Sequence, residues 1–291
     1  MAITRLTLLL PSLLLLSLVL ASCTGTSPST ATQNTLDSML ALRSDEDRAR
    51  DSARHPAETL VFFQVEPGMT VAEALPGRGW YTNILANYLG GDGVLYGVNY
   101  SDRMFHMFGP ANAAMIAKRI ASTALFPSNV ASFTDNGIAA QGFTFETVPE
   151  GLTGSVDRML FIRALHNLNR FEADAGTRTA ALAACYDLLA DDGLVGVVQH
   201  RAPESAQDDG AVGNRGYLKQ SAVIAMFEEA GFKLVTTSEI NANPKDRPDA
   251  EDIVWRLPPS LRGSEGNAEQ RAAVLAIGES DRMTLLFRKQ Q

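Results

Sequence analysis

The chain has 291 residues, of which 45% are hydrophobic and 20% are charged, a composition that is ordinary for a soluble globular protein. Its formal net charge of −8 argues against a general affinity for nucleic acid or for an anionic membrane surface. The length allows one large α/β domain or two small ones.

The first residues follow the pattern of a secretory signal. One positively charged side chain, Arg5, precedes a mostly apolar run over residues 8–20, and small residues then lead into Cys23. The letters Leu-Ala-Ser-Cys resemble a bacterial lipobox, in which Cys23 would become the lipidated first residue of the mature protein. An ordinary signal peptide and an uncleaved anchor are the alternatives.

We therefore expect a signal peptide over residues 1–22 and a polar Ser/Thr tether over residues 23–35. The protein would be exported to the periplasm and held at a membrane through its lipidated cysteine. Thr24 stands where an aspartate would mark retention at the inner membrane, which favours the outer membrane. Only Cys185 then remains as a thiol, and its helical, leucine-rich surroundings predict a core position.

Residues 36–291 show no internal repeat and no second composition regime, so we expect a single domain with an N-terminal helix. The patterns predict helices over residues 36–54, 80–89, 111–124, 173–189, 217–230 and 268–276. They predict strands over residues 69–75, 94–100, 143–148, 155–162, 194–200, 232–240 and 282–288. Strands that alternate with helices predict a mostly parallel sheet covered on both faces.

The N-terminal helix carries arginines at helical spacing. Arg43, Asp47, Arg50 and Arg54 fall on one face. This face is either a solvated, salt-bridged surface or a lid whose arginines reach an anionic group of a substrate.

The stretch from Met69 to Thr82 joins a buried strand, a tight glycine turn and the start of a helix. α/β proteins hold nucleotide-like ligands with this arrangement, because backbone NH groups face the crevice and Gly77 and Gly79 lack a Cβ that would keep a ligand away. Glu73, near the strand end, is placed to accept hydrogen bonds from a ligand. A tight turn without a ligand has the same appearance in a sequence.

The ordered segments AEALPGRGWYT, VLYGVNYS, DRMLFIRALHN and DRMTLLFRK resemble those of class I S-adenosylmethionine-dependent methyltransferases. The likeness is greatest to a bacterial group of predicted methyltransferases, through RARDSARHPAETLVFF, PGRGWYT, NPKDRP and SDRMTLLFRK, and it covers roughly residues 43–289. It implies a doubly wound, Rossmann-like α/β fold. The mostly parallel seven-stranded sheet would have the order 3-2-1-4-5-7-6 and an antiparallel last strand.

The resemblance also implies a cofactor, S-adenosylmethionine. Glu73, Gly77 and Gly79 would line its methionine part, and Tyr100 would touch its adenosine. Asn99 stands where the family carries an acid for the ribose hydroxyls, so the charge of that hydrogen bond is missing. The acid on the adenine side is not located; Asp135 and Glu146 are both candidates.

Methyl transfer needs a base only when the acceptor must lose a proton. His166 follows the fourth strand and His200 ends the fifth, which are neighbours in the family sheet, so both are candidate catalytic residues. Arg163 and Asn167 share this rim and could orient a small-molecule acceptor. A structural role is the alternative for each histidine.

Other chemistries have less support. The four histidines offer no pair at ligand spacing on one helix and no cysteine cluster exists, so no metal site is expected. No G-x-S-x-G nucleophile motif occurs. A nicotinamide-dependent enzyme would have a glycine where Thr82 stands.

Two functions stay open. The first is a methyltransferase acting on an unidentified small molecule. The second is a non-catalytic lipoprotein that binds a small ligand on a methyltransferase fold, because export would place the protein where S-adenosylmethionine is not known to be supplied. Fold alone does not decide between them.

Overall fold

The computed structural model describes Met1 and residues 30–207 and 210–290. The predicted signal peptide, most of the tether and Cys23 lie outside the described residues. Among the described residues, no helix is long and apolar enough to cross a membrane.

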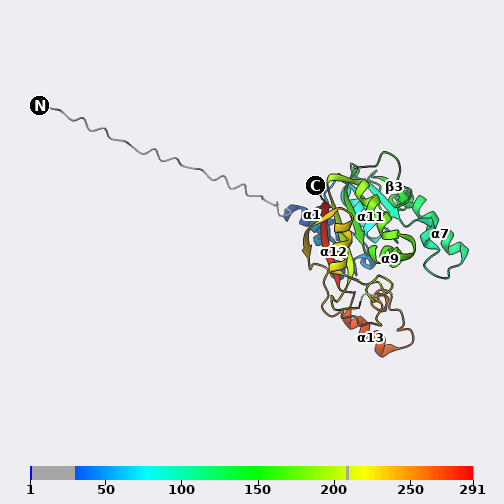
Figure 1. Ribbon diagram of the computed structural model, residues 1–291. Coiled ribbons are helices and arrows are strands. Elements are labelled where there is room, and N and C mark those ends of the chain that lie inside the picture. Colours follow the sequence, from blue (N-terminus) through cyan, green and yellow to red (C-terminus); the bar gives the residue numbers. More distant parts are fainter. Residues whose placement is uncertain (2–29, 208–209, 291) are drawn as a thin grey trace.

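The described chain folds as a central sheet between layers of helices, with α7 and α13 at the periphery (Figure 1). The strands are β1 Thr70–Ala74, β2 Val94–Asn99, β3 Ala139–Thr144, β4 Val156–Ile162, β5 Leu189–Ala202, β6 Leu218–Lys219, β7 Phe232–Ser238 and β8 Arg282–Lys289. The helices are α1 Thr30–Leu40, α2 Asp45–Arg48, α3 Asp51–Arg54, α4 Pro56–Phe62, α5 Trp80–Leu89, α6 Asp102–Phe105, α7 Ala113–Ala124, α8 Phe126–Ala131, α9 Leu165–Arg170, α10 Glu172–Ala175, α11 Thr177–Leu188, α12 Gln220–Glu229 and α13 Ala268–Ile277, with a 3-10 turn at Val254–Arg256.

The sheet has the strand order β3-β2-β1-β4-β5-β8-β7, and the short β6 pairs with the end of β5. β1 to β5 are parallel, whereas β8 runs antiparallel to both β5 and β7. This is the order 3-2-1-4-5-7-6 of the main strands, and it confirms the predicted Rossmann-like methyltransferase fold.

Two hydrophobic layers cover the sheet, because successive strand residues point to opposite faces. Val71 and Leu160 face one layer, which contains residues of α1, α4, α5 and α8. Ala72 and Met159 face the other, which contains residues of α9, α11 and α12. Glu73 shares its parity with Val71, so its carboxyl lies on the α4 and α5 side.

The N-terminal prediction was partly wrong. The expected helix over residues 36–54 is three helices, and the first begins at Thr30, inside the expected tether. The break has a local cause, because the Ser44 side chain accepts a hydrogen bond from the Asp47 backbone NH and starts a new helix. His55 then adopts a left-handed conformation between α3 and Pro56.

Three further boundaries differ from prediction. β3 ends at Thr144, where a turn closed by the Thr147 NH stops the strand expected over residues 143–148. The helix expected from Tyr217 begins only at Gln220, since the two preceding residues pair with β5 as β6. The strand expected over residues 194–200 begins earlier, at Leu189, and its register with β4 shifts between Leu189 and Leu194.

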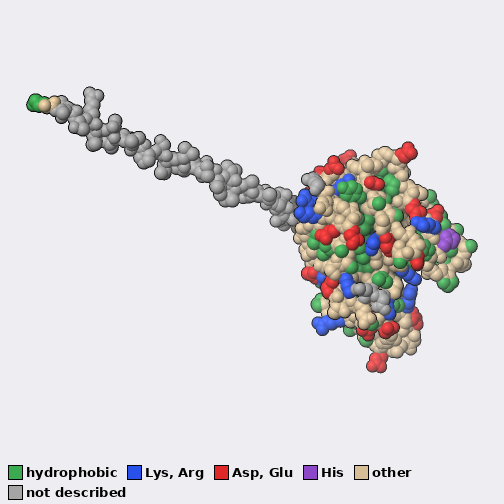
Figure 2. Space-filling model, in the orientation of Figure 1, with side chains coloured by type: hydrophobic (Ala, Val, Ile, Leu, Met, Phe, Trp, Pro, Cys, Tyr) green, Lys and Arg blue, Asp and Glu red, His purple; other side chains and the backbone are tan. Residues whose placement is uncertain are grey.

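The surface mixes charges of both signs. On the face shown in Figure 2, acidic and basic side chains alternate across the described part of the chain.

Gly196 of β5 lies against the Phe63 ring and leaves no room for a larger side chain. A Cβ on Gly196 of β5 would lie 2.5 Å from the buried ring of Phe63, which follows α4. Gly196→Ala should therefore lower the free energy of unfolding by about 1–3 kcal/mol, as overpacked core positions do. Denaturant unfolding measures this, and Phe63→Leu in the same chain should restore part of the loss. An unchanged midpoint in Gly196→Ala would contradict this packing.

Candidate functional site

The glycine turn after β1 has the backbone geometry that it needs to reverse tightly. Leu75, Gly77 and Gly79 all have positive φ, at 53°, 60° and 80°. The Gly79 NH donates to the Pro76 carbonyl over 2.9 Å, and Gly79 is the N-cap residue of α5. Gly77 is exposed, and a Cβ there would contact only the Leu75 carbonyl oxygen, at 3.8 Å. The space above Gly77 is therefore open to a ligand.

Gly79 differs from Gly77. It is buried, and a Cβ would lie 2.7 Å from the ring of Phe133. In this conformation Gly79 makes close packing possible between the start of α5 and the segment after α8. Gly79 is therefore needed for this packing as well as for the positive φ of the turn.

Glu73 is a buried carboxyl at the end of β1, with 4% of its surface exposed. The Thr82 hydroxyl donates to its Oε2 over 2.6 Å. Burial raises the pKa of Glu73 to about 7, and this rise is opposed by the Thr82 hydrogen bond and by the positive charge of Arg163. Near neutral pH the group can therefore accept a hydrogen bond from a ligand or donate one.

Asn99 and Tyr100 are occupied by contacts within the protein. The Asn99 amide donates to the hydroxyls of Ser122 and Thr123 on α7, and its Oδ1 accepts from the Tyr100 NH. Tyr100 is 2% exposed and donates its hydroxyl to the Ala164 carbonyl, while burial raises its pKa. In this conformation neither side chain has its polar group free for a ligand.

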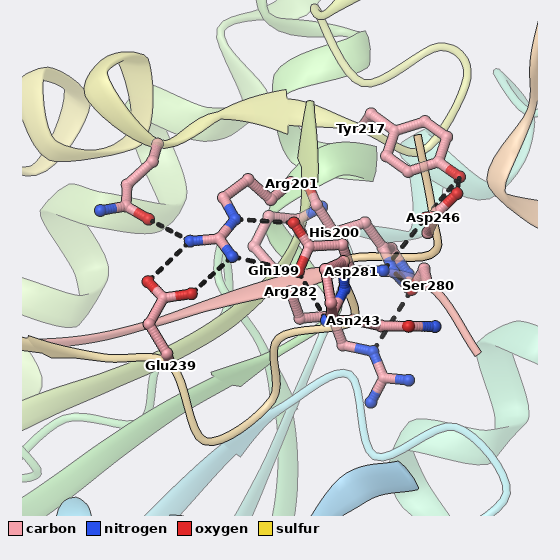
Figure 3. Close-up of polar contacts among 12 residues, drawn as sticks. Gln199, His200, Arg201, Tyr217, Glu239, Asn243, Asp246, Ser280, Asp281 and Arg282 are labelled. Carbon is pink, nitrogen blue, oxygen red and sulfur yellow. Dashed lines mark hydrogen bonds and ion pairs between the residues drawn. The ribbon is translucent and has the colours of Figure 1, made fainter. Parts of the chain in front are cut away.

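His166 and His200 lie close together, with ring centroids 5.5 Å apart. The His200 Nδ1 is 2.6 Å from the Ser280 hydroxyl, as Figure 3 shows. Burial lowers the pKa of His166 to about 4, and burial followed by the neighbouring His166 lowers that of His200. Both imidazoles are therefore neutral at pH 7.

Gln199 fixes the tautomer of His166. The Gln199 Nε2 donates to the Gly216 carbonyl over 2.9 Å, which turns Oε1 toward His166. That oxygen accepts from the His166 backbone NH and lies 3.3 Å from its Nδ1. Because a carbonyl oxygen can only accept, Nδ1 carries the proton and Nε2 keeps its lone pair. His166 Nε2 is thus available to accept a proton.

Arg163 follows β4 directly and has a left-handed backbone, with φ 58°. Its NH donates to the Val198 carbonyl over 2.7 Å, which joins the ends of β4 and β5. Burial lowers the pKa of Arg163 to about 9, with smaller contributions from Arg54 and Arg282, so the guanidinium stays charged at neutral pH. Asn167, in the first turn of α9, hydrogen-bonds the Tyr100 hydroxyl.

The structure brings part of the predicted site together. Arg163 acts electrostatically on Glu73, on His166 and on His200, so these four groups share one region at the carboxyl ends of β1, β4 and β5. Asn99 is turned toward α7 instead, and Tyr100 lies in the core.

The same region contains groups that the sequence analysis did not assign. Gln199 orients His166, and Arg282 and Glu279 come from the start of β8 and the loop before it. Gln199 could have been found in the sequence from its position near the end of a predicted strand, next to His200. For Glu279 the sequence offers no signal, because it lies in an exposed-looking polar loop.

A second polar network lies beyond the histidines. Arg201 forms ion pairs with Glu239 and Asp281 over 2.7 and 2.8 Å, and Figure 3 shows these groups around its guanidinium. Tyr217 and Arg256 both contact Asp246. A pocket of about 310 Å³ adjoins Arg201, Asp246 and Asp281. These contacts fix the end of β5 against β8 and the long loop before α13.

Within residues 30–207 and 210–290, no three His, Cys, Asp or Glu side chains are placed to hold a metal ion together. Cys185 is buried, as predicted, and burial raises the pKa of its thiol.

No known family model matches the sequence, and no curated protein matches it. Solved structures do match. The [4+2]-cyclase SpnF is 12% identical, with a TM-score of 0.50, and the match covers 82% of this chain and 80% of the cyclase. A SAM-dependent methyltransferase from Aquifex aeolicus is 16% identical, with a TM-score of 0.45 and coverage of 72% and 93%.

The 1,6-didemethyltoxoflavin-N1-methyltransferase of Burkholderia thailandensis, with bound S-adenosylhomocysteine, is 12% identical, with a TM-score of 0.45 and coverage of 89% and 87%. At these identities the likeness concerns the fold.

The raised pKa of Glu73 predicts a pH-dependent stability. Between its ordinary value of 4.5 and about 7, the unfolded chain has an ionised Glu73 while the folded chain keeps it protonated, so stability falls as pH rises through this window. Glu73→Gln removes that fall. Its stability relative to the wild type should rise from pH 4.5 to 7 by up to about 3 kcal/mol.

Denaturant unfolding at a series of pH values measures this difference, in which contributions of other groups cancel. Glu229→Gln, at an exposed position of α12, is the control. A constant difference between Glu73→Gln and the wild type across the window would contradict the buried, protonated carboxyl.

Proposed function

We propose that the protein is an S-adenosylmethionine-dependent methyltransferase that acts on a small-molecule acceptor, within the bacterial group that its motifs resemble. The observation that carries the proposal is the open glycine turn after β1 in a sheet of methyltransferase strand order. Gly77 there has free space where a Cβ would stand, and the buried Glu73 lies at the adjoining strand end. These features fit a cofactor with an amine and a sulfonium centre.

The cofactor, when bound, supplies an electrophilic methyl group. The chain would hold its methionine part at Gly77 and Gly79 and accept a hydrogen bond from its ammonium at Glu73. His166 would take a proton from an acceptor hydroxyl or amine through its unprotonated Nε2. Burial of His166 would also exclude water from this proton transfer.

One observation favours a second function, a non-catalytic ligand-binding module. The Asn99 amide, at the place of the ribose-binding acid, already bonds Ser122, Thr123 and the Tyr100 NH. A ligand without ribose hydroxyls would not require a hydrogen bond from Asn99.

The proposed place of action is the cell envelope. We infer export and attachment to the outer membrane through lipidated Cys23, from the lipobox-like letters and from Thr24. Metabolic labelling with a fatty acid, compared between the wild type and Cys23→Ala, tests this attachment.

Gly77→Val tests the cofactor site. The valine side chain would fill the open space at the turn, so affinity for S-adenosylhomocysteine should fall more than tenfold in calorimetric titration. The matched control is Gly151→Val, which also places a valine at a positive φ, 86°, in open space away from the site. Both variants should fold, at a cost of about 1–2 kcal/mol or somewhat more for a β-branched side chain.

Equal affinity in Gly77→Val and Gly151→Val would remove the assigned site. Absence of binding in the wild type at millimolar S-adenosylmethionine or S-adenosylhomocysteine would reject the methyltransferase and favour the binding module.

His166→Ala tests the proton acceptor. Transfer of a labelled methyl group from S-adenosylmethionine to a small-molecule extract should slow by about 10²-fold or more, which is typical for loss of a general base. Cofactor affinity should stay within a few-fold of the wild type. His106→Ala, at an exposed position after α6, is the control. Full activity in His166→Ala would exclude His166 from the mechanism.

A further inference from the structure

Four arginines surround one carboxylate beside the histidine pair. We call Arg50, Arg54, Arg163 and Arg282 the arginine cluster. Three of them contact Glu279: the Arg50 Nε is 2.7 Å from Oε1, and the Arg54 Nε and Arg282 Nη2 are 3.4 and 2.5 Å from Oε2. The cluster thus joins the α3 region, the end of β4 and the start of β8.

The arginine cluster has unused hydrogen-bond donors. The Arg54 side chain is 3% exposed, and its buried Nη1 has no hydrogen-bond partner. No hydrogen bond or ion pair joins the Arg163 guanidinium to another group of the described chain. Arg282, by contrast, uses its guanidinium on Glu279, Ser280 and the Ala53 carbonyl. A buried donor that is left unpaired is costly, so the Arg54 Nη1 points to a missing acceptor, whereas the partly exposed Arg163 guanidinium is accessible from solvent.

The charges of the cluster do not balance. Four guanidinium groups face Glu279 alone, which leaves an excess of three positive charges before Glu73 is considered. Burial, together with the neighbouring arginines, lowers the pKa of Arg54 to about 10 and that of Arg163 to about 9, yet both stay protonated at neutral pH. Buried charges of one sign are stable only when opposite charge is supplied.

The cluster lies where an acceptor would react. Arg54, Arg163 and Arg282 all act electrostatically on His200 and on Tyr81, which belongs to the first turn of α5 after the glycine turn. Arg54 also stacks on Trp80, 4.5 Å from the ring centroid. The cluster therefore adjoins the glycine turn at one side and the histidine pair at the other.

We propose that the arginine cluster binds an oxyanion, a carboxylate or a phosphate, of the methyl acceptor. This inference rests on the proposed methyltransferase function and names its substrate class, an anionic small molecule. Arg163 and Arg54 supply the free donors, and guanidinium groups match such anions through paired N–H bonds.

The cofactor itself does not supply the missing charge. The methionine carboxylate of S-adenosylmethionine is balanced by the adjacent ammonium, and the sulfonium leaves the molecule with a net positive charge. A cation next to this excess of positive charge is unfavourable, so we infer that the anion comes from the acceptor.

Thermal unfolding in sodium phosphate and in sodium chloride at equal ionic strength tests the anion site without any cofactor. Phosphate should raise the Tm of the wild type and of Arg271→Gln, an exposed arginine on α13, by mass action. Arg163→Gln should lose this rise. In chloride its Tm should equal or exceed that of the wild type, because an unpaired like charge has been removed.

Arg163→Lys keeps the positive charge but has fewer hydrogen-bond donors, so it should keep part of the rise in Tm with phosphate. It replaces Arg163→Gln in this test if that variant does not fold. Absence of a phosphate effect in the wild type, or an undiminished effect in both Arg163 variants, would overturn the anion site.

Calorimetric titration with S-adenosylhomocysteine, with and without saturating phosphate, identifies the source of the anion. Equal affinity in both buffers supports an acceptor anion, since both ligands then bind together. Competition would assign the cluster to the cofactor carboxylate and overturn the proposal. A wild type that binds phosphate but no S-adenosylhomocysteine would overturn the methyltransferase and the acceptor with it, whereas the reverse result would overturn only the anion site.

Discussion

The ion pairs of Glu279 with Arg50, Arg54 and Arg282 determine how the candidate site is enclosed. The pairs with Arg50 and Arg54 join residues that are 229 and 225 positions apart in the chain and hold the α3 region against the loop before β8, where Arg282 pairs with the same carboxylate. A hydrogen bond from the Arg282 guanidinium to the Ala53 carbonyl of α3 adds to this contact at the strand ends. Because one carboxylate serves three guanidinium groups, the same contact that closes the region also leaves it positively charged.

The fold could be predicted because its signals are local. α5 begins and ends where the sequence places it, since Gly79 precedes its first residue and Gly90 follows its last. The strand order follows from the family pattern and is confirmed. The prediction of one N-terminal helix over residues 36–54 was wrong. Arginines at helical spacing are compatible with one long helix, but the Ser44 side chain caps a new helix. A hydrogen bond from a backbone NH to a serine side chain competes with continuation of the preceding helix.

The candidate site could be predicted only to the level of strand ends. Glu73, Arg163, His166 and His200 meet because parallel strands bring their carboxyl ends to one edge of the sheet. The sequence could not predict that Asn99 turns toward α7, because this depends on hydroxyls 23 and 24 residues away. It also could not predict the pairing of Arg54 with Glu279, since nothing in a polar loop specifies its partner. Whether these groups bind a ligand is still a proposal.

The position of β8 has a consequence for the order of folding. This strand comes late in the chain, yet it lies between β5 and β7 in the sheet. β5 therefore keeps an unpaired edge, and Glu279 stays away from its arginines, until residues 282–289 have been synthesised. Pairing over so long a sequence separation is slow. A chain that cannot complete its sheet early therefore keeps this edge of β5 open for longer.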